Sequence, residues 1–199
     1  MKAPLLAGAV KILTRVDVHW LCQLDTRQRI YFANHTSHLD TLVLWAALPS
    51  KLRDLTRPAA AKDYWAANKL RLYLATCVFH AVLIERMNVK KSNNPLAAVL
   101  QALGDRYSLI LFPEGKRNPG PDLGEFKSGL YHLARSRPDL ELVPVHIKNL
   151  NRILPKGRFL PVPSSTRVTF GPPLKIIGAE TKAAFLKRAR AAVCSLQML

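Results

Sequence analysis

Acidic residues and cysteines are scarce in this sequence, and each shortage excludes a class of protein. Asp and Glu number 13 against 30 Lys and Arg, which gives a formal net charge of +17. A surface of this charge favours an anionic partner such as nucleic acid, an anionic bilayer or a phosphorylated substrate. The three cysteines, Cys22, Cys77 and Cys194, lie far apart. This spacing excludes a disulfide framework and a zinc knuckle, and it fits a reduced cytosolic setting.

The sequence also lacks an apolar run long enough to cross a bilayer, which takes about 20 residues. The apolar stretch 72–84 is interrupted by Thr76 and His80 and is followed closely by Arg86, so we interpret it as buried core or interfacial surface. The apolar stretch 3–10 is short for a signal-peptide core. The basic residues form no long run either, which disfavours a disordered arm that binds nucleic acid.

Residues 1–20 have the spacing of one helix with an apolar face. Apolar side chains recur at helical intervals among the basic residues Lys2, Lys11 and Arg15. Such a helix either lies on an anionic lipid surface or packs on its own domain, and the sequence favours neither. We therefore expect an N-terminal amphipathic helical segment at 1–25, followed by one domain at 26–199.

The rest of the chain alternates between strand-like and helix-like segments. Strands are predicted at 29–33, 78–85, 108–112, 141–147 and 166–170, and helices at 41–48, 59–70, 95–103, 126–135 and 182–196. This alternation predicts an α/β fold, in which a mixed and largely parallel sheet is flanked by helices.

A first polar cluster, Asn34-His35-Thr36-Ser37-His38-Leu39-Asp40, directly follows the strand predicted at 29–33. If His35 lies in the turn before the next helix, Asp40 can fold back onto it, fix its tautomer and stabilise its cation. The other imidazole nitrogen is then free to take a proton from a hydroxyl group. Two alternatives remain: an ordinary turn-and-cap cluster, or a metal site of His35, His38 and Asp40, for which the sequence offers no clear further ligand cluster.

A second polar cluster, Phe112-Pro113-Glu114-Gly115-Lys116-Arg117-Asn118, follows the strand predicted at 108–112. Gly115 permits a left-handed turn, and Arg117 can bind a phosphate in a bidentate fork. Arg86 ends another predicted strand in the same way. Each arginine alone is more typical of a solvated surface, but their shared placement indicates a phosphate pocket beside a base.

Together these segments resemble the glycerolipid acyltransferase family, which carries four ordered motifs. The cluster 34–40 matches the first, a histidine and an aspartate separated by four residues, and 112–118 resembles the third. The weaker second and fourth correspond to 80–86 and 142–145, and segments 126–129 and 168–174 are also similar. The resemblance extends from about 30 to 174. His80 replaces a usual glycine, Lys116 a threonine and Asn118 a serine.

The resemblance implies a general base, His35, oriented by Asp40. It implies acceptor binding by Arg86, Glu114, Gly115, Lys116 and Arg117, and an acyl-donor side shaped by Val143, Pro144 and Val145. The donor is acyl-CoA or acyl carrier protein, with no metal or cofactor. The acceptor is a lysophospholipid, with 1-acylglycerol-3-phosphate, which gives phosphatidic acid, as the first choice.

Other functions remain open at this point. The acceptor can be another lysolipid, such as a lyso-ornithine lipid, or the chain can be an inactive family member. From a different class, it can be a non-catalytic basic module that binds membranes or nucleic acid. No pattern of stacking aromatics is present, so we do not expect nucleic acid as a partner. We expect an anionic membrane surface as a partner, and a peripheral or monotopic location on the cytoplasmic face of a membrane.

Overall fold

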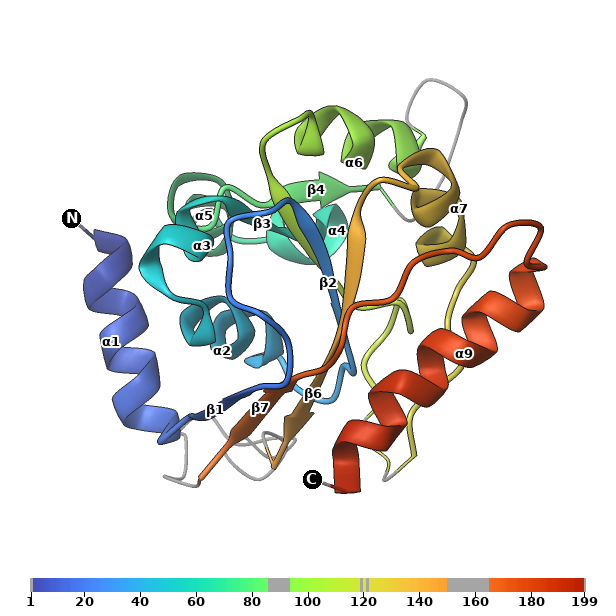
Figure 1. Cartoon of the computed structure of the whole chain (residues 1–199). Coiled ribbons are helices and arrows are strands. Elements are labelled where there is room, and N and C mark those ends of the chain that lie inside the picture. Colours follow the sequence, from blue (N-terminus) through green and yellow to red (C-terminus); the bar gives the residue numbers. More distant parts are fainter. Residues whose placement is uncertain (1, 86–93, 119, 121, 150–164, 199) are drawn as a thin grey trace.

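Seven strands form one sheet in the computed structural model, which describes residues 2–85, 94–118, 120, 122–149 and 165–198 (Figure 1). The strand order is β1-β7-β6-β2-β5-β3-β4, and every neighbouring pair is parallel except β6 and β7. The strands are β1 (Asp17–Trp20), β2 (Arg29–Ala33), β3 (Thr56–Ala61), β4 (Val82–Ile84), β5 (Ser108–Leu111), β6 (Glu141–Lys148) and β7 (Arg167–Phe170).

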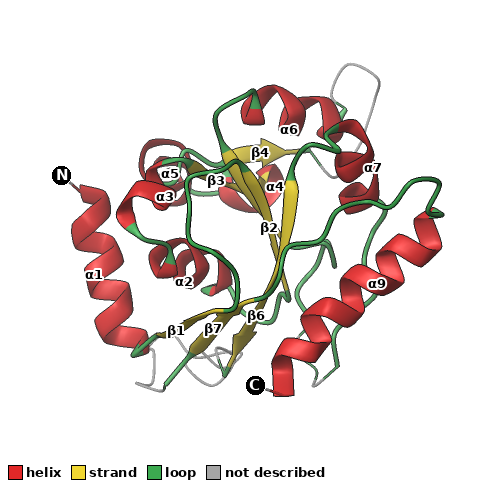
Figure 2. Cartoon of the chain, in the orientation of Figure 1, coloured by secondary structure: helices red, strands yellow, loops and turns green. Residues whose placement is uncertain are grey.

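Helices lie on both sides of this sheet (Figure 2). They are α1 (Lys2–Thr14), α2 (Asp40–Ala47), α3 (Ser50–Asp54), α4 (Lys62–Trp65), α5 (Lys69–Tyr73), α6 (Pro95–Leu103), α7 (Gly129–Ser136) and α9 (Lys182–Ser195), with a π turn η1 (Leu74–Val78) and a 3-10 turn η3 (Leu196–Met198). The predicted α/β class, with a mixed and largely parallel sheet, is confirmed.

The strand β2 lies at the centre of the sheet and is buried along its whole length. Because side chains alternate along a strand, β2 contributes to two cores. Tyr31 and Ala33 pack in the core that includes α1 and α2. Ile30 and Phe32 pack in the core that includes α6, α7 and α9. The first polar residue after β2 therefore emerges from a strand that is fixed on both faces.

Three segments differ from the sequence-based prediction. The strand predicted at 78–85 begins only at Val82, because residues 74–78 form the turn η1. The helix predicted at 1–20 ends at Thr14, where Arg15 has a φ of 41°, and residues 17–20 form β1 along β7. The helix predicted at 59–70 is wrong at its start, because residues 59–61 belong to β3. That strand is enclosed between β5 and β4, so pairing overrides the helix propensity of its three alanines.

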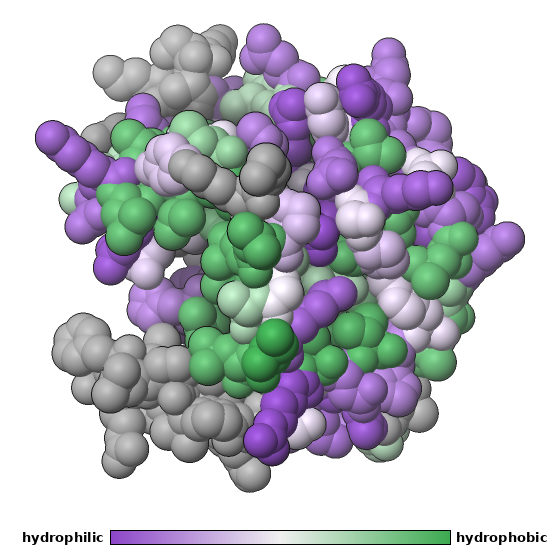
Figure 3. Space-filling model, turned by 90° about the vertical axis from the view of Figure 1, so that its left-hand side faces the viewer, coloured by the Kyte–Doolittle hydropathy of each residue, from purple (hydrophilic) through white to green (hydrophobic). Residues whose placement is uncertain are grey.

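The outer face of α1 exposes large apolar side chains. Leu5 is 75% exposed and Ile12 is 80% exposed. Figure 3 shows the face of the molecule that carries α1, and hydrophobic residues gather in its middle with hydrophilic residues around them. Within the described part of the chain, no helix is both long and apolar enough to span a bilayer. The stretch 72–84 instead forms the end of α5, the turn η1 and β4, with Ala75 and Phe79 buried.

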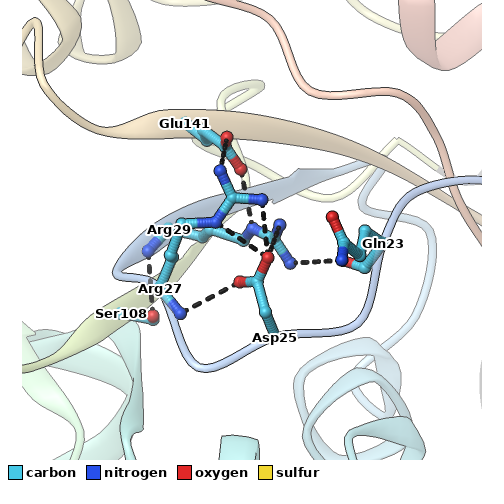
Figure 4. A network of polar contacts seen from close by, with 6 residues as sticks. All are labelled: Gln23, Asp25, Arg27, Arg29, Ser108 and Glu141. Atoms are coloured by element: carbon cyan, nitrogen blue, oxygen red, sulfur yellow. Dashed lines mark hydrogen bonds and ion pairs between the residues drawn. The ribbon is translucent and has the colours of Figure 1, made fainter.

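A paired charge network closes the amino ends of β2 and β6 (Figure 4). The side chain of Arg29 is only 1% exposed, and it donates to Glu141 Oε2 at 2.9 Å, to Asp25 Oδ2 at 3.1 Å and to the carbonyl oxygen of Gln23 at 2.9 Å. Arg27 donates to the same two carboxylates, at 2.6 Å and 2.8 Å. We call Asp25, Arg27, Arg29 and Glu141 the amino-end network.

Candidate active site

His35 and Asp40 meet at the carboxyl end of β2, as the sequence predicts. The Nδ1 atom of His35 lies 2.7 Å from Asp40 Oδ2. The same oxygen accepts the backbone N–H groups of Thr36 at 2.6 Å and Ser37 at 2.8 Å. Asp40 is completely buried, whereas the side chain of His35 is 22% exposed. Oδ2 is thus fixed by three donors, and the Nε2 atom of His35 has no hydrogen-bond partner among the described residues.

The backbone of His35 is held from both sides by the loop that follows β5. Glu114 Oε1 accepts the His35 N–H at 2.8 Å, and the N–H of Asn118 donates to the His35 carbonyl oxygen at 2.7 Å. Glu114 Oε2 accepts the N–H of Gly124 at 3.0 Å. A Cβ atom at Gly124 would lie 2.6 Å from this oxygen, so a side chain at this position would displace the Glu114 carboxylate.

Glu114 is therefore a positioning residue in this structure. It is only 3% exposed, and both of its carboxylate oxygens accept backbone N–H groups. Its predicted contact with the acceptor stays a prediction, while its contacts explain why a carboxylate is useful here. The sequence carried no signal for this role beyond the order of the two motifs.

Asn34 fastens the end of β2 to β6. Its side-chain amide donates to the carbonyl oxygen of Ile147 at 2.9 Å and accepts the N–H of Ile147 at 2.8 Å. The side chain is buried, and this reciprocal pair satisfies it. Together with the loop that holds His35, it leaves little freedom at the start of the segment 34–40.

Two cavities meet at His35. The first has a volume of about 280 Å³ and a basic, aromatic wall that includes His38, Tyr64, Lys116 and Arg117. The second has a volume of about 220 Å³ and a mostly apolar wall that includes Ile84, Leu111, Phe112 and Leu130. His35, Phe112 and Ala59–Ala61 line both, and the imidazole stacks on the ring of Phe112 at 4.4 Å between centroids.

The structure places two of the five predicted acceptor residues at the first cavity. Lys116 and Arg117 line it and are exposed, and Arg117 contacts the Nε2 atom of His38. Gly115 has a φ of 69° and lines the second cavity, which agrees with the left-handed turn predicted for it. Arg86 lies outside the described residues.

The predicted acyl-donor residues lie in the core behind the site. Val143 and Val145 are completely buried in β6, and Pro144 between them is also buried. None of the three lines either cavity beside His35. Their placement supports a role in holding β2, whereas direct contact with a donor stays a prediction.

The alternative metal site fits the geometry poorly. The Nδ1 atom of His35 faces Asp40, but the Nε2 atom of His38 faces the guanidinium of Arg117, which only donates hydrogen bonds. Burial of His38, followed by the charges of Arg117 and Arg71, lowers the pKa of its imidazole. Among the described residues, no group of three or more His, Cys, Asp or Glu side chains has an arrangement suited to a metal ion.

Comparison with known proteins gives a consistent result. The family model described as Acyltransferase matches residues 15–148, which is more than half of the chain. The 1-acyl-sn-glycerol-3-phosphate acyltransferase of Limnanthes alba is 29% identical over 174 residues, which cover 85% of this chain and 59% of that protein. The enzyme of the same name from Salmonella typhimurium is 29% identical over 127 residues, covering 60% and 46%. The chain thus spans about half the length of these curated relatives.

A solved structure extends the similarity to the fold. The crystal structure of the 1-acyl-sn-glycerophosphate (LPA) acyltransferase PlsC from Thermotoga maritima superimposes with a TM-score of 0.75. The match covers 99% of this chain and 78% of that one, at 18% sequence identity. At this identity the likeness concerns the fold, including the N-terminal helix and the mixed sheet.

Proposed function

The chain belongs to the acyltransferase family, and we propose that it transfers a fatty acyl group from a thioester to the free hydroxyl of a lysophospholipid. The acceptor we propose is 1-acylglycerol-3-phosphate, which gives phosphatidic acid. The names of the similar proteins support this acceptor, and so does the basic cavity beside His35. Another lysolipid, such as a lyso-ornithine lipid, is the alternative acceptor.

The observation that carries the proposal is the position of His35 between two unlike cavities. The basic cavity suits the phosphate of the acceptor, because Lys116 and Arg117 supply cations there. The apolar cavity suits hydrocarbon, because Ile84, Leu111 and Leu130 form much of its wall. The free hydroxyl of the phosphorylated glycerol and the thioester carbonyl of the acyl chain would then meet at the imidazole.

The chemical step we propose uses His35 first as a base and then as an acid. Its Nε2 atom takes the proton of the acceptor hydroxyl as the oxygen attacks the thioester carbonyl carbon. Asp40 holds Nδ1 at 2.7 Å and stabilises the imidazolium that forms. When the tetrahedral intermediate collapses, the carbon–sulfur bond breaks and the thiolate takes the same proton. The products are the ester and a free thiol, and the base is restored.

The donor we propose is acyl-CoA or acyl carrier protein. Both are anionic, and a chain of net charge +17 attracts either one by long-range electrostatics. Every step above uses only side chains of this chain and the two substrates. The donor type is decided by supplying each thioester separately.

We also propose that the protein works at an anionic membrane surface, to which it binds peripherally. Leu5 and Ile12 on α1 are exposed, and Lys11 and Arg15 lie close to them in the sequence. Apolar insertion would resist salt, whereas the attraction of basic residues is screened within a Debye length. Sedimentation with anionic vesicles should therefore show partial release at high salt, and complete release for Leu5→Glu/Ile12→Glu. Full release of the unaltered protein by salt would contradict insertion.

The activity is tested by thioester release with purified protein, labelled acyl-CoA or acyl carrier protein, and a panel of lysolipids. We expect thiol release that depends on the acceptor, with the diacyl product identified by mass. Acceptor-independent release would indicate a thioesterase instead. A lack of release with every acceptor, in a folded protein, would favour the non-catalytic module.

A further inference from the structure

Two arginines from different elements are connected through a pair of stacked rings at the basic cavity. His38 stacks on Tyr64, with centroids 5.2 Å apart and planes 21° apart. Arg117 contacts His38 on one side, and the guanidinium carbon of Arg71 lies 4.5 Å from the centre of the Tyr64 ring. His38 follows β2, Tyr64 is in α4, Arg71 is in α5 and Arg117 follows β5. We call these four residues the arginine–ring stack.

The contact with Arg117 defines the protonation state of His38. A guanidinium has only donors, so the Nε2 atom of His38 accepts, and its proton is on Nδ1. His38 is therefore neutral in this arrangement. Burial, Arg117 and Arg71 all lower its pKa, in that order of size, which keeps it neutral at neutral pH. The charge of Arg71 is among the causes that lower the pKa of His38, and His38 lines the basic cavity.

The two arginines of the arginine–ring stack are not paired with carboxylates of the described residues. Throughout the described part of the chain, neither Arg71 nor Arg117 lies within ion-pair distance of a carboxylate. Lys116 beside them also has no such partner there. Like charges repel, so their convergence costs free energy unless an anion joins them. A guanidinium left without a carboxylate is available to bind a phosphate in a bidentate fork.

We propose that Arg71 is a second anion-binding residue of the basic cavity, which acts with Arg117 to favour acceptors whose head group carries two negative charges over those that carry one. The proposal rests on the function proposed above, since it concerns the acceptor of that reaction. Arg71 is held over Tyr64, which lines the cavity, while its own side chain is exposed and free to turn toward a bound head group. A phosphate monoester carries up to about two charges at neutral pH and a diester one, so each added cation favours the monoester.

The test compares Arg71→Gln with Arg106→Gln in the full-length protein. Arg106 is a matched control, because it is also exposed and its guanidinium carbon lies 5.4 Å from the ring of Tyr107, beyond α6 and before β5. Acyl transfer is measured with a monoester and a diester lysolipid of the same acyl chain. For Arg71→Gln we expect kcat/KM with the monoester to fall about fivefold, and the monoester-to-diester ratio to fall about threefold. Arg106→Gln should match the unaltered protein, and Arg71→Lys should recover most of the ratio.

A second measurement separates the anion site from the proposed reaction. Inorganic phosphate is titrated while the ring signals of His38 are followed by NMR, with His38→Gln used to assign them. We expect saturable shifts, and a Kd about fivefold higher in Arg71→Gln than in Arg106→Gln. If no lysolipid is acylated but this difference appears, the acyltransferase function fails and the anion site stands. The proposal is overturned if Arg71→Gln leaves both the phosphate Kd and the acceptor ratio unchanged, or if phosphate does not shift His38 at all.

Discussion

The two ends of β2 carry polar clusters that use their charges in opposite ways. In the amino-end network, both arginines contact carboxylates, and Arg29 is buried among them. At the carboxyl end, the buried carboxylates Asp40 and Glu114 bond to backbone N–H groups and to an imidazole. The cations there, Lys116 and Arg117, lie on the surface without carboxylate partners among the described residues.

We interpret the paired charges at the amino end as structural, and we propose that the cations at the carboxyl end bind a ligand. A buried cation requires partners within the protein, because an unpaired buried charge is strongly destabilising. Cations at a binding site are more useful when the partner is the ligand, because a carboxylate neighbour would compete with it. The chain thus completes its charge pairing at the amino end of β2. It leaves pairing open at the carboxyl end, where two cavities meet.

Among the substitutions that test this comparison, His35→Ala is expected to have the largest effect on activity. Loss of a positioned base should reduce kcat/KM by about 10²–10⁴-fold, with little change in stability, because the His35 side chain is partly exposed. The control is His132→Ala, which removes an exposed histidine from α7. Steady-state kinetics and thermal unfolding of both variants measure this. Activity of His35→Ala within tenfold of the unaltered enzyme would contradict the assignment of His35 as base.

Asp40→Asn should give a somewhat smaller loss, about 10²–10³-fold in kcat. The amide keeps the size of the side chain but not the charge that stabilises the imidazolium. The amide oxygen can take the place of Oδ2 and accept the N–H groups of Thr36 and Ser37, and the amide nitrogen then takes the place of Oδ1, which has no hydrogen-bond partner among the described residues. The pH–rate profile should change together with the rate. An unaltered profile and rate would mean that Asp40 only begins α2.

At the other end of β2, Arg29→Met should lower stability and leave catalysis intact. Removing the buried guanidinium leaves Glu141 and Asp25 partly uncompensated, and we expect a loss of about 3 kcal/mol in the free energy of unfolding. Arg27→Gln is the matched control, because its side chain is 57% exposed and should contribute less than about 1 kcal/mol. Urea unfolding measures both. The comparison between the two ends fails if Arg29→Met lowers kcat/KM of the folded enzyme more than about threefold.

The smallest expected effect concerns acid stability at the amino-end network. The hydrogen bond from Arg27 holds the pKa of Asp25 below its ordinary value of 3.8. The unfolded chain therefore takes up a proton before the folded one as pH falls. The contribution of Asp25 is present above pH 3.8 and decreases as pH falls below this value. Asp25→Asn should flatten this part of the curve of unfolding free energy against pH. An identical slope in both proteins would show that Asp25 does not couple to folding.

The parts of the fold that the sequence predicts correctly have strong local signals. The strand β2 agrees with its predicted bounds because it is a short β-prone segment next to a polar turn. The helix α6 does so because Asn94 caps it and Pro95 opens it. The strand β1 was missed because its partner β7 lies about 150 residues away and its four residues continue an apolar helical spacing. Pairing over such a distance leaves no local signal in the sequence.

At the candidate site, the sequence predicts the contact between His35 and Asp40 but not the other contacts of the segment 34–40. The spacing of His35 and Asp40 indicates their contact, because one turn of chain can return onto itself. The bond from Glu114 to the backbone of His35 was not predictable from spacing, since it joins loops 79 residues apart. The placement of Arg71 over Tyr64 depends on the break at 66–68 between α4 and α5, which falls inside the single helix predicted at 59–70.

The hydrogen bonds from the loop after β5 to the backbone of His35 also limit how segments of this chain can be exchanged with those of relatives. Because Glu114 and Asn118 hold the N–H and carbonyl oxygen of His35, the two loops set one shared geometry. A chimera that takes the segment 34–40 from a relative and keeps 112–118 from this chain would combine two loops whose backbones come from different structures. A change of one residue in the length of either loop would displace the imidazole of His35 even if His35 and Asp40 were both kept. In protein engineering, the segments 34–40 and 112–118 should therefore be exchanged together as one unit.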